Sequence, residues 1–308
     1  DRDFPLSPDE GGAPQSLLRL FHSQRQAGHD VGIVTTGTSS EPFIDSLHRS
    51  VQPEVDLLKI ARARDADVVH FHAAAEWLQP AVVAARVATL AHIRGVCDRS
   101  MSNYTNPIFV SRSHAENHGG SHYVYNGIDP DTVAFESEPE DYLAFLGKVR
   151  RSKKGARTAI AVANEKRREI RVAGGRKLNI PQTWLPYQRY IKVLGVLDSE
   201  RKMAMVGKAS ALLFPIQWEE PFGLVLIEAM AAGTPVIAFD RGAVPEIVRH
   251  GVTGFVVRDF SEMCDAVDRI EDISRSACRR HVEDMFSIAA TAAGVMAYYE
   301  RALGGEFW

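Results

Sequence analysis

The sequence predicts an α/β protein built from two Rossmann-like domains, and three observations support this prediction. Short apolar runs alternate with helical patterns along most of the chain, which is typical of parallel sheets. The alternation occurs in two series, separated by the polar and acidic segment Gly127–Asp141 with its two prolines. The chain has 308 residues, of which 45% are hydrophobic, and single cores stop growing near about 250–300 residues. Two cores are therefore expected.

The first series supplies the strands and helices of the N-terminal domain. Apolar runs predict strands at Asp30–Thr36, Asp67–His72, Val87–Ile93, Asn106–Ser111 and Ser121–Gly127. Helical patterns cover Ala13–Ala27 and Val55–Arg64. A doubly wound domain normally opens with a buried strand before its first glycine loop, yet the chain begins DRDFPLSPDEGG. We expect about ten residues to precede it, because a missing central strand would leave its neighbours with unpaired backbone groups.

The second series supplies the C-terminal domain. Strands are predicted at Tyr142–Gly147, Glu169–Gly175, Tyr190–Val196, Ser210–Ile216, Thr234–Asp240 and Gly254–Val257. The last apolar pattern, Phe286–Leu303, predicts a helix that returns to the first domain. The predicted domains are residues 1–133 with 287–308, and residues 134–286. A site is expected in a central cleft between them, where both sets of strand ends face.

The segment WEEPFGLVLIEAMAAGTPVIAF holds two carboxylates, Glu220 and Glu228, on either side of the start of a helix. Gly223–Ala232 contains strong helix formers, and Gly233 stands where a C-terminal cap belongs. Ligands of such strand–helix–strand units lie beyond the strand ends, against the positive N-terminus of the helix. The N–H groups near Phe222 and Gly223 are therefore expected to face a ligand.

Amides that attract an anion, between carboxylates that repel one, suit a ligand that is anionic in the middle and carries hydroxyls at both ends. A nucleotide sugar has this form: the helix N-terminus would bind its diphosphate, and the carboxylates would accept hydrogen bonds from its hydroxyls. Spacing alone leaves open that Glu228 is a solvated helix residue and Glu220 a loop carboxylate.

The run EPFGLVLIEAMAAGTPVIA resembles the E-x7-E signature of the retaining GT-B glycosyltransferases of family 4. The resemblance continues through RGAVPEIVRHGVTGFVV and is specific over Gly195–Val257. Weaker similarity recurs in DEGGAPQSLLRL, AGHDVGIVT, ADVVHFH and YNGID, in the order that the family uses. The resemblance implies a GT-B fold and sugar transfer from a nucleotide-sugar donor, most commonly a UDP-sugar, to an acceptor hydroxyl.

The basic loop FLGKVRRSKKGART resembles the family's G-R-x4-K-G element, in which an Arg and a Lys bind the diphosphate. Lys148 falls on the Arg position, where it keeps the charge but loses bidentate geometry. Lys154 falls on the Lys position, although the loop is one residue longer and Lys153 competes for that role. The alternative is a solvated basic loop, in which case catalysis would lack a clamp on the leaving group.

The resemblance also implies roles for residues elsewhere in the chain. Gly12, in the glycine pair of EGGAPQS, would let the backbone approach a phosphate of the donor, or the acceptor, closely. His92 matches a histidine that reaches the donor sugar, and backbone groups near Leu197 would contact the base. The amides from Phe222 to Leu224 would bind the diphosphate, with Glu228 on the ribose and Glu220 on the transferred sugar.

The histidines His70 and His72 end a predicted strand without a third ligand at metal spacing, so they are interpreted as structural or acceptor-side residues. No D-x-D motif is seen at a strand end. Members of the resembled family need no divalent metal, so we expect no metal ion and no cofactor. In the family, the acceptor hydroxyl attacks on the face of the departing phosphate. Catalysis then consists of positioning and electrostatic stabilisation.

Composition excludes several other classes. A net charge of −3 argues against nucleic acid as a partner. The three cysteines, Cys97, Cys264 and Cys278, lack metal-like spacing and suggest a reducing compartment. No apolar stretch approaches the length needed to span a bilayer, so at most peripheral membrane contact and a cytoplasmic location are expected. The acceptor, whether a saccharide, a lipid-linked group or a small molecule, is not specified.

Two other classes of function share much of this pattern. A nucleotide-sugar epimerase or phosphorylase of GT-B fold would have a similar crevice but would act on water, phosphate or the sugar itself. A non-catalytic nucleotide-sugar binder is favoured by Lys148 and the longer loop. A dinucleotide oxidoreductase is disfavoured, because no G-x-G-x-x-G follows a predicted strand.

Overall fold

The computed structural model describes residues 12–35, 44–46, 50–72, 79–84, 86–94, 104–175 and 190–308. The chain divides into two compact units, for which the sequence predicts boundaries at 133/134 and 286/287. Unit 1 comprises Asp1–Gly127 and Ile288–Trp308, and unit 2 comprises Ile128–Ser287. The expected glycine loop before Gly12 and the residue Cys97 lie outside the described residues.

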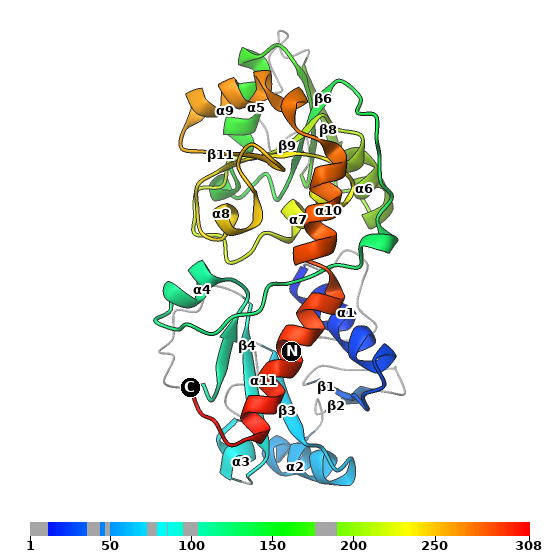
Figure 1. Ribbon diagram of the computed structural model, residues 1–308, viewed down its shortest axis with the longest axis vertical. Coiled ribbons are helices and arrows are strands. Elements are labelled where there is room, and N and C mark those ends of the chain that lie inside the picture. The colour runs from blue at the N-terminus through cyan, green and yellow to red at the C-terminus, as the bar shows by residue number, and fades with distance from the viewer. Residues whose placement is uncertain are drawn as a thin grey trace. The chain divides into compact units, whose positions relative to one another are not determined.

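Unit 1 contains short parallel strands and the helices that cover them (Figure 1). Its elements are α1 (Gly12–Gln26), β1 (Ile33–Thr35), β2 (Ile44–Ser46), α2 (Pro53–Ala63), β3 (Val68–His72), α3 (Gln79–Ala84), β4 (Ala88–Ile93), β5 (Pro107–Phe109), α4 (Arg112–Glu116) and α11 (Ile288–Leu303). Within the described ranges, β1 pairs with β2, and a second parallel sheet has the order β3-β4-β5. The three strand pairs named here, β1–β2, β3–β4 and β4–β5, are parallel, as the alternation of apolar runs and helices predicts.

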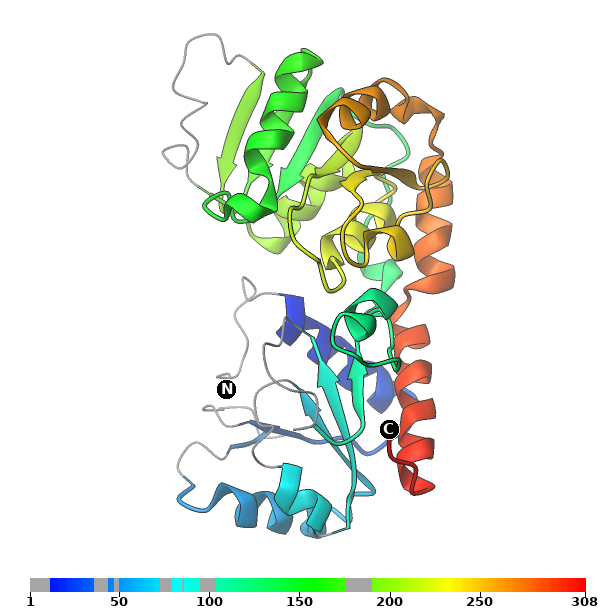
Figure 2. The same ribbon diagram turned by 90° about the vertical axis from the view of Figure 1, so that its left-hand side faces the viewer.

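The C-terminal helix α11 is part of the core of unit 1, where it packs on α1 and β4 (Figure 2). Leu20 of α1, Leu90 of β4 and Val295 of α11 belong to one buried cluster. Burial of such side chains contributes roughly 1.5–3 kcal/mol each. The apolar face of α11 therefore holds the end of the chain on unit 1.

The predicted strand Ser121–Gly127 is wrong, because it contributes only one isolated bridge, between Phe109 and Tyr123. Two backbone hydrogen bonds form it: the Phe109 N–H donates to the His122 oxygen, and the Val124 N–H donates to the Phe109 oxygen. Its partner β5 ends at Phe109, and α4 begins three residues later at Arg112. The short partner strand leaves no backbone for a longer ladder.

Unit 2 contains one six-stranded sheet in the order β11-β10-β9-β6-β7-β8, with every pair parallel. Its elements are β6 (Tyr142–Leu146), α5 (Ala156–Glu165), β7 (Glu169–Ala173), β8 (Ile191–Gly195), α6 (Ser199–Gly207), β9 (Ala211–Phe214), α7 (Leu224–Ala231), β10 (Val236–Phe239), α8 (Val244–Ile247), β11 (Gly254–Val257), α9 (Phe260–Asp268) and α10 (Arg275–Met285), with short 3-10 turns η3 (Pro130–Thr132), η4 (Ser152–Lys154) and η7 (Ile270–Asp272). Helix α5 packs against α9, whereas α7 packs against α6 and α10. The strand prediction for this unit is confirmed in every element.

Helix α7 follows the predicted pattern closely, and both of its ends are set by glycine. Gly223 at its N-cap and Gly233 after its C-cap both have a φ of +90°. At the C-terminus, the Gly233 N–H donates to the Met230 oxygen and the Thr234 N–H donates to the Ala229 oxygen. These two bonds form a Schellman motif, which ends the helix before β10.

Among the described residues, none of the helices is both long enough and apolar enough to cross a bilayer.

Candidate functional site

Three loops meet at the carboxyl edge of the sheet in unit 2, because they follow the three neighbouring strands β10, β9 and β6. Neighbouring parallel strands end at the same edge, which is where ligands of such sheets bind. The loop after β6 carries Lys148 and Lys154, and the loop after β9 carries Trp218 and Glu220. The topology therefore brings the basic loop and the first carboxylate of the E-x7-E pattern together.

The Glu220 carboxylate is held by two donors on one oxygen. Lys154 Nζ lies 2.9 Å from Glu220 Oε2, and Trp218 Nε1 donates to the same oxygen at 3.0 Å. The side chains of Lys154 and Glu220 are 23% and 13% exposed, so water screens this pair less than it screens a surface pair. Within the described part of the chain, Oε1 accepts no hydrogen bond and remains available to a ligand hydroxyl.

The second lysine of the basic loop lies on the same indole. Lys153 Nζ is 4.1 Å from the centroid of the Trp218 ring, and Lys154 Nζ is 5.0 Å from it. Such contacts between an ammonium and an aromatic face are attractive. Trp218 therefore holds both candidate diphosphate-binding lysines beside Glu220.

A glycine permits the close packing of the basic loop on the loop after β9. Gly155 has a φ of +78°, and a Cβ there would lie 2.0 Å from the Pro215 oxygen. The Gln217 N–H also donates to the Lys153 oxygen at 2.8 Å. Only glycine can adopt this positive φ and also lie this close to the Pro215 oxygen. Gly155 therefore fixes the positions of Lys153 and Lys154.

A second glycine fixes Glu220 from the other side. Gly242, in the loop after β10, has a φ of +55°, and a Cβ there would lie 2.4 Å from both the N and O atoms of Glu220. The Ala243 N–H donates to the Glu220 oxygen at 3.0 Å, and the Gly242 N–H donates to Glu219 Oε2 at 2.6 Å. The backbone that carries Glu220 is therefore bounded by the loops of two neighbouring strands.

The start of α7 lies at the same edge, directly after Glu220. The Gly223 N-cap provides no side-chain hydrogen bond to the first turn, and the N-terminus of a helix favours an anionic ligand group. Phe222 is buried, with its ring 5.9 Å from that of Phe286, and Leu224 is half-buried. Phe222 and Gly223 are therefore expected to bind a ligand through their backbone N–H groups.

The second carboxylate, Glu228, lies one turn into α7 and is 15% exposed. Lys202 of α6 approaches it, with Nζ 3.8 Å from Glu228 Oε2. Leu197, between β8 and α6, is half-buried. The start of α6 therefore lies near Glu228.

Lys148 is exposed and makes no side-chain hydrogen bond or ion pair with the described residues. Its loop is nevertheless fixed, because a Cβ on Gly174 would lie 2.2 Å from the Gly147 oxygen. The Val149 N–H donates to the Gly174 oxygen. The backbone at Lys148 is thus held against the end of β7 while its ammonium extends into solvent.

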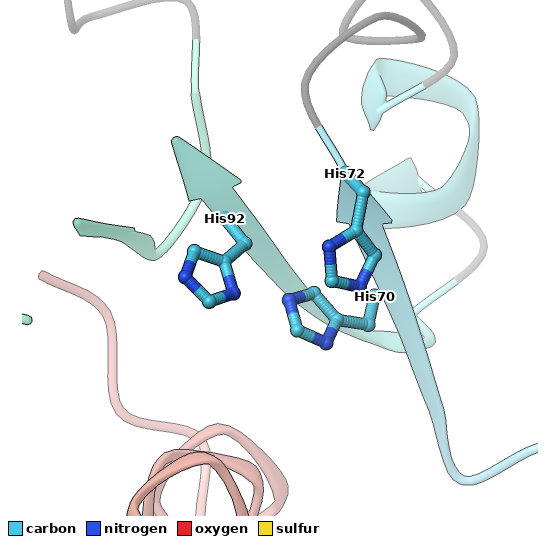
Figure 3. A group of neighbouring side chains, drawn as sticks. All are labelled: His70, His72 and His92. Carbon is cyan, nitrogen blue, oxygen red and sulfur yellow. The ribbon is translucent and has the colours of Figure 1, made fainter. Parts of the chain in front are cut away.

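The remaining predicted residues, Gly12 and His92, belong to unit 1. Gly12 is the first residue of α1. His92 is fully buried and lies in register with His72 on the neighbouring strand. Since His70 is two residues before His72 on β3, all three imidazoles lie on the same face of the sheet (Figure 3).

The expectation that His70 and His72 have no third ligand at metal spacing is therefore wrong. One ring nitrogen from each of His70, His72 and His92 lies within 4.8 Å of the others. The reason is the parallel register of β3 and β4, which places His92 beside His72 although they are distant in sequence.

Burial and a nearby guanidinium hold this histidine cluster neutral. Burial and, to a smaller extent, the charge of Arg94 lower the pKa of His70 to about 3. The pKa values of His72 and His92 lie well below the usual range, mainly because of burial and then because of neighbouring positive groups. Burial also lowers the pKa of Arg94 to about 10, which still leaves it charged at neutral pH.

Sequence reasoning missed several residues that the structure places around the candidate sites. Trp218 and Gly242 contact Glu220 in unit 2, Lys202 approaches Glu228, and Arg94 lies beside the histidines in unit 1. Gly242 lies in the family-like run RGAVPEI, and a glycine in a turn there could have indicated a close backbone contact. The other contacts depend on strand pairing and carry no local pattern.

Comparisons with known proteins identify the class to which this fold belongs. Residues 140–272 match the family model described as "Glycosyl transferases group 1". The D-inositol 3-phosphate glycosyltransferase of Mycobacterium leprae is 35% identical over 116 residues, which are 35% of this chain and 27% of that protein. The chain spans about a quarter to a third of the length of the curated relatives it matches.

Solved structures resemble nearly the whole chain. AviGT4, a glycosyltransferase involved in avilamycin A biosynthesis, has a TM-score of 0.77 at 22% identity and covers 97% of this chain and 92% of its own. Anabaena HepE in complex with UDP has a TM-score of 0.74 at 16% identity, with coverages of 97% and 98%. The chain therefore has the fold of the GT-B glycosyltransferases, with two Rossmann-like domains, as the sequence predicts.

The contact between Gly242 and Glu220 generates a prediction. Gly242→Ala should lower the free energy of unfolding of unit 2 and move Glu220, because the new methyl group would meet the Glu220 backbone. Gly251→Ala is the matched control, since Gly251 has a φ of +74° in the same unit and an added Cβ would meet nothing within 4 Å. The control should lose only the backbone cost, about 1–2 kcal/mol.

Urea unfolding and the NMR resonance of the Trp218 indole N–H measure the two effects of Gly242→Ala. The indole resonance should shift in Gly242→Ala and stay in place in Gly251→Ala. Equal losses of stability with an unmoved resonance would show that Gly242 does not position Glu220.

Proposed function

We propose that this protein is a glycosyltransferase that moves a sugar from a nucleotide-sugar donor to an acceptor hydroxyl with retention of anomeric configuration. The observation that carries the proposal is the meeting of Lys154, Glu220 and the start of α7 at the carboxyl edge of unit 2, within the segment that matches the glycosyl transferases group 1 model. A UDP-sugar is the first candidate donor, because the fold resembles Anabaena HepE in complexes with UDP and with UDP-glucose.

The diphosphate of the donor binds at the N-terminus of α7, where backbone amides of Phe222 to Leu224 and the helix dipole favour negative charge. Lys154 has three N–H donors, of which one is directed to Glu220. It therefore reaches a phosphate oxygen either with its remaining donors or by leaving Glu220. Lys148, which extends into solvent, supplies a second cation to the same group.

The two carboxylates bind the hydroxyl groups at opposite ends of the donor. Glu228 accepts hydrogen bonds from the ribose, and backbone groups near Leu197 contact the base. Glu220 Oε1 accepts a hydrogen bond from the transferred sugar while Oε2 stays with Trp218. Both hydrogen bonds are charge-assisted, which makes them stronger than those to neutral groups.

The chemical step breaks the bond between the anomeric carbon and the diphosphate oxygen. Positive charge develops on the sugar ring and negative charge on the leaving phosphate, where Lys154 and the α7 amides stabilise it. The acceptor hydroxyl attacks from the face that the phosphate leaves, and the departing phosphate takes its proton. No enzyme nucleophile and no divalent metal ion is needed in this scheme.

Binding and transfer test the proposed function directly. We expect UDP to raise the melting temperature of the full chain, and a UDP-sugar to donate its sugar to an acceptor in the presence of excess EDTA. The anomeric configuration of the product, determined by NMR, should be that of the donor. Loss of transfer in EDTA would contradict metal independence, and rapid release or isomerisation of the donor without acceptor would favour a phosphorylase or epimerase.

Replacement of each carboxylate should affect a different part of the donor. Glu228→Ala should weaken binding of both UDP and the UDP-sugar by about 1.5–3 kcal/mol, through loss of hydrogen bonds to the ribose. Glu220→Gln should lower transfer while the dissociation constant of free UDP stays nearly constant. Glu165→Ala, an exposed carboxylate of α5, is the control for net charge.

Isothermal titration with UDP, together with transfer kinetics, separates the two carboxylates. If Glu220→Gln weakens UDP binding as much as Glu228→Ala does, the donor does not lie across the start of α7 in the proposed direction.

The adjacent lysines offer a second matched pair. Lys154→Ala should lower kcat more than it raises KM, because negative charge on the diphosphate grows as the bond breaks. Lys153→Ala should have the smaller effect on kcat, since Lys153 lies on the Trp218 ring and makes no ion pair with Glu220 among the described residues. A change confined to KM in Lys154→Ala would instead indicate uniform binding of ground state and transition state.

A further inference from the structure

His70, His72, His92 and Arg94 form a histidine–arginine cluster in unit 1. The sugar transfer proposed above does not use the hydrogen-bond donors of this cluster. Arg94 Nε donates to His72 Nδ1 at 3.3 Å, and Arg94 Nη2 lies 3.3 Å from His92 Nδ1. A guanidinium can only donate, so both Nδ1 atoms are acceptors. Because the two imidazoles are neutral, each carries its proton on Nε2.

The third imidazole has the same tautomer for a related reason. His70 Nδ1 lies 2.7 Å from Tyr299 Oη, and Gln24 Nε2 donates to that hydroxyl at 3.5 Å. We assign the Tyr299 hydroxyl as the donor to His70 Nδ1, which places the proton of this neutral imidazole on Nε2. The Nε2 atoms of His70 and His92 are buried and have no hydrogen-bond partner in the described structure.

A metal ion does not fit this arrangement, although three histidines are close together. A histidine that binds a metal normally donates its other ring N–H to a carboxylate, a carbonyl or water. Here the other nitrogen of His72 and of His92 accepts from a guanidinium, so the nitrogen that would bind the metal is protonated. A half-buried guanidinium beside the site also repels a metal cation.

The positive charge of Arg94 favours an anionic ligand over a metal cation. Its third contact in the described part of the chain is with a neutral atom, Asn126 Oδ1 at 2.6 Å, and no described carboxylate pairs with it. Removing a charge from water, even in part, is costly when no counter-ion is present. An oxyanion would accept hydrogen bonds from the buried Nε2–H groups and would also neutralise the guanidinium.

We propose that the histidine–arginine cluster binds an oxyanion, and that this oxyanion is a phosphate or carboxylate group of the sugar acceptor. The assignment to the acceptor rests on the proposed function. In that function, Lys154 and the start of α7 in unit 2 already provide for the diphosphate of the donor, which leaves the cluster in unit 1 for the second substrate. His92 then contacts the acceptor, in place of the donor sugar that the family resemblance implies.

The test uses the full chain with ¹⁵N-labelled histidine and follows the ring nitrogens by NMR. Before any ligand is added, His70, His72 and His92 should show the Nε2–H tautomer. In saturating UDP, which occupies the donor site, inorganic phosphate or acetate should shift these Nε2 resonances in a saturable manner. Glucose at the same concentration should leave them unchanged.

Matched variants connect the binding to Arg94. Arg94→Gln should weaken phosphate binding about tenfold or more, since a charge-assisted contact is lost. Arg62→Gln, an exposed arginine of α2, should leave it unchanged. Arg94→Lys keeps the charge and should retain part of the affinity, which separates loss of charge from loss of fold.

Three results would overturn the proposal. The first is that neither phosphate nor acetate shifts the Nε2 resonances of the wild-type chain. The second is that Zn²⁺ binds at micromolar concentration and the Nε2–H tautomers are lost. The third is that UDP displaces phosphate from the cluster. The titration requires no sugar transfer. Phosphate binding in a protein without transferase activity would therefore support the oxyanion site and remove only the proposed function.

Discussion

The geometry of the candidate donor site depends on one constraint, the close approach of backbone at two glycines. Gly155 lies against the Pro215 carbonyl, and Gly242 lies against the backbone of Glu220. Each has a positive φ that other residues adopt only at a cost. Because β10, β9 and β6 are neighbours in the sheet, these two contacts join the loops of three strands into one surface. The ion pair between Lys154 and Glu220 is a consequence of that packing.

This packing matters for the chemistry because it keeps charged groups in place before a ligand arrives. A leaving group is stabilised best by cations and dipoles that need little reorganisation. Lys153 and Lys154 are held by Trp218, and Glu220 is bounded on both sides. In unit 1, packing also holds polar groups in place before a ligand arrives. There, burial keeps the histidines neutral, so that they are hydrogen-bond donors around one charged arginine.

Much of unit 2 could be predicted from sequence because its signals are local. Continuous apolar runs identify its parallel strands, and Gly223 and Gly233 bound α7 through their own backbone preferences. The prediction failed at Ser121–Gly127, where a β-rich segment has a partner strand too short to form a ladder. It also failed for the histidine cluster, because the pairing of His72 with His92 is set by the register of two strands. Arg94, Trp218 and Lys202 acquire their contacts in the same way, through tertiary packing.

The position of Lys154 in a nucleotide-sugar complex tests the central claim most directly. A crystal structure of the protein with a bound, non-transferable UDP-sugar would locate the Lys154 ammonium relative to the diphosphate and to Glu220. The account predicts a hydrogen bond from Lys154 Nζ to a phosphate oxygen at the start of α7, with a sugar hydroxyl on Glu220. A diphosphate bound away from α7, with Lys154 still engaged only by Glu220, would contradict it.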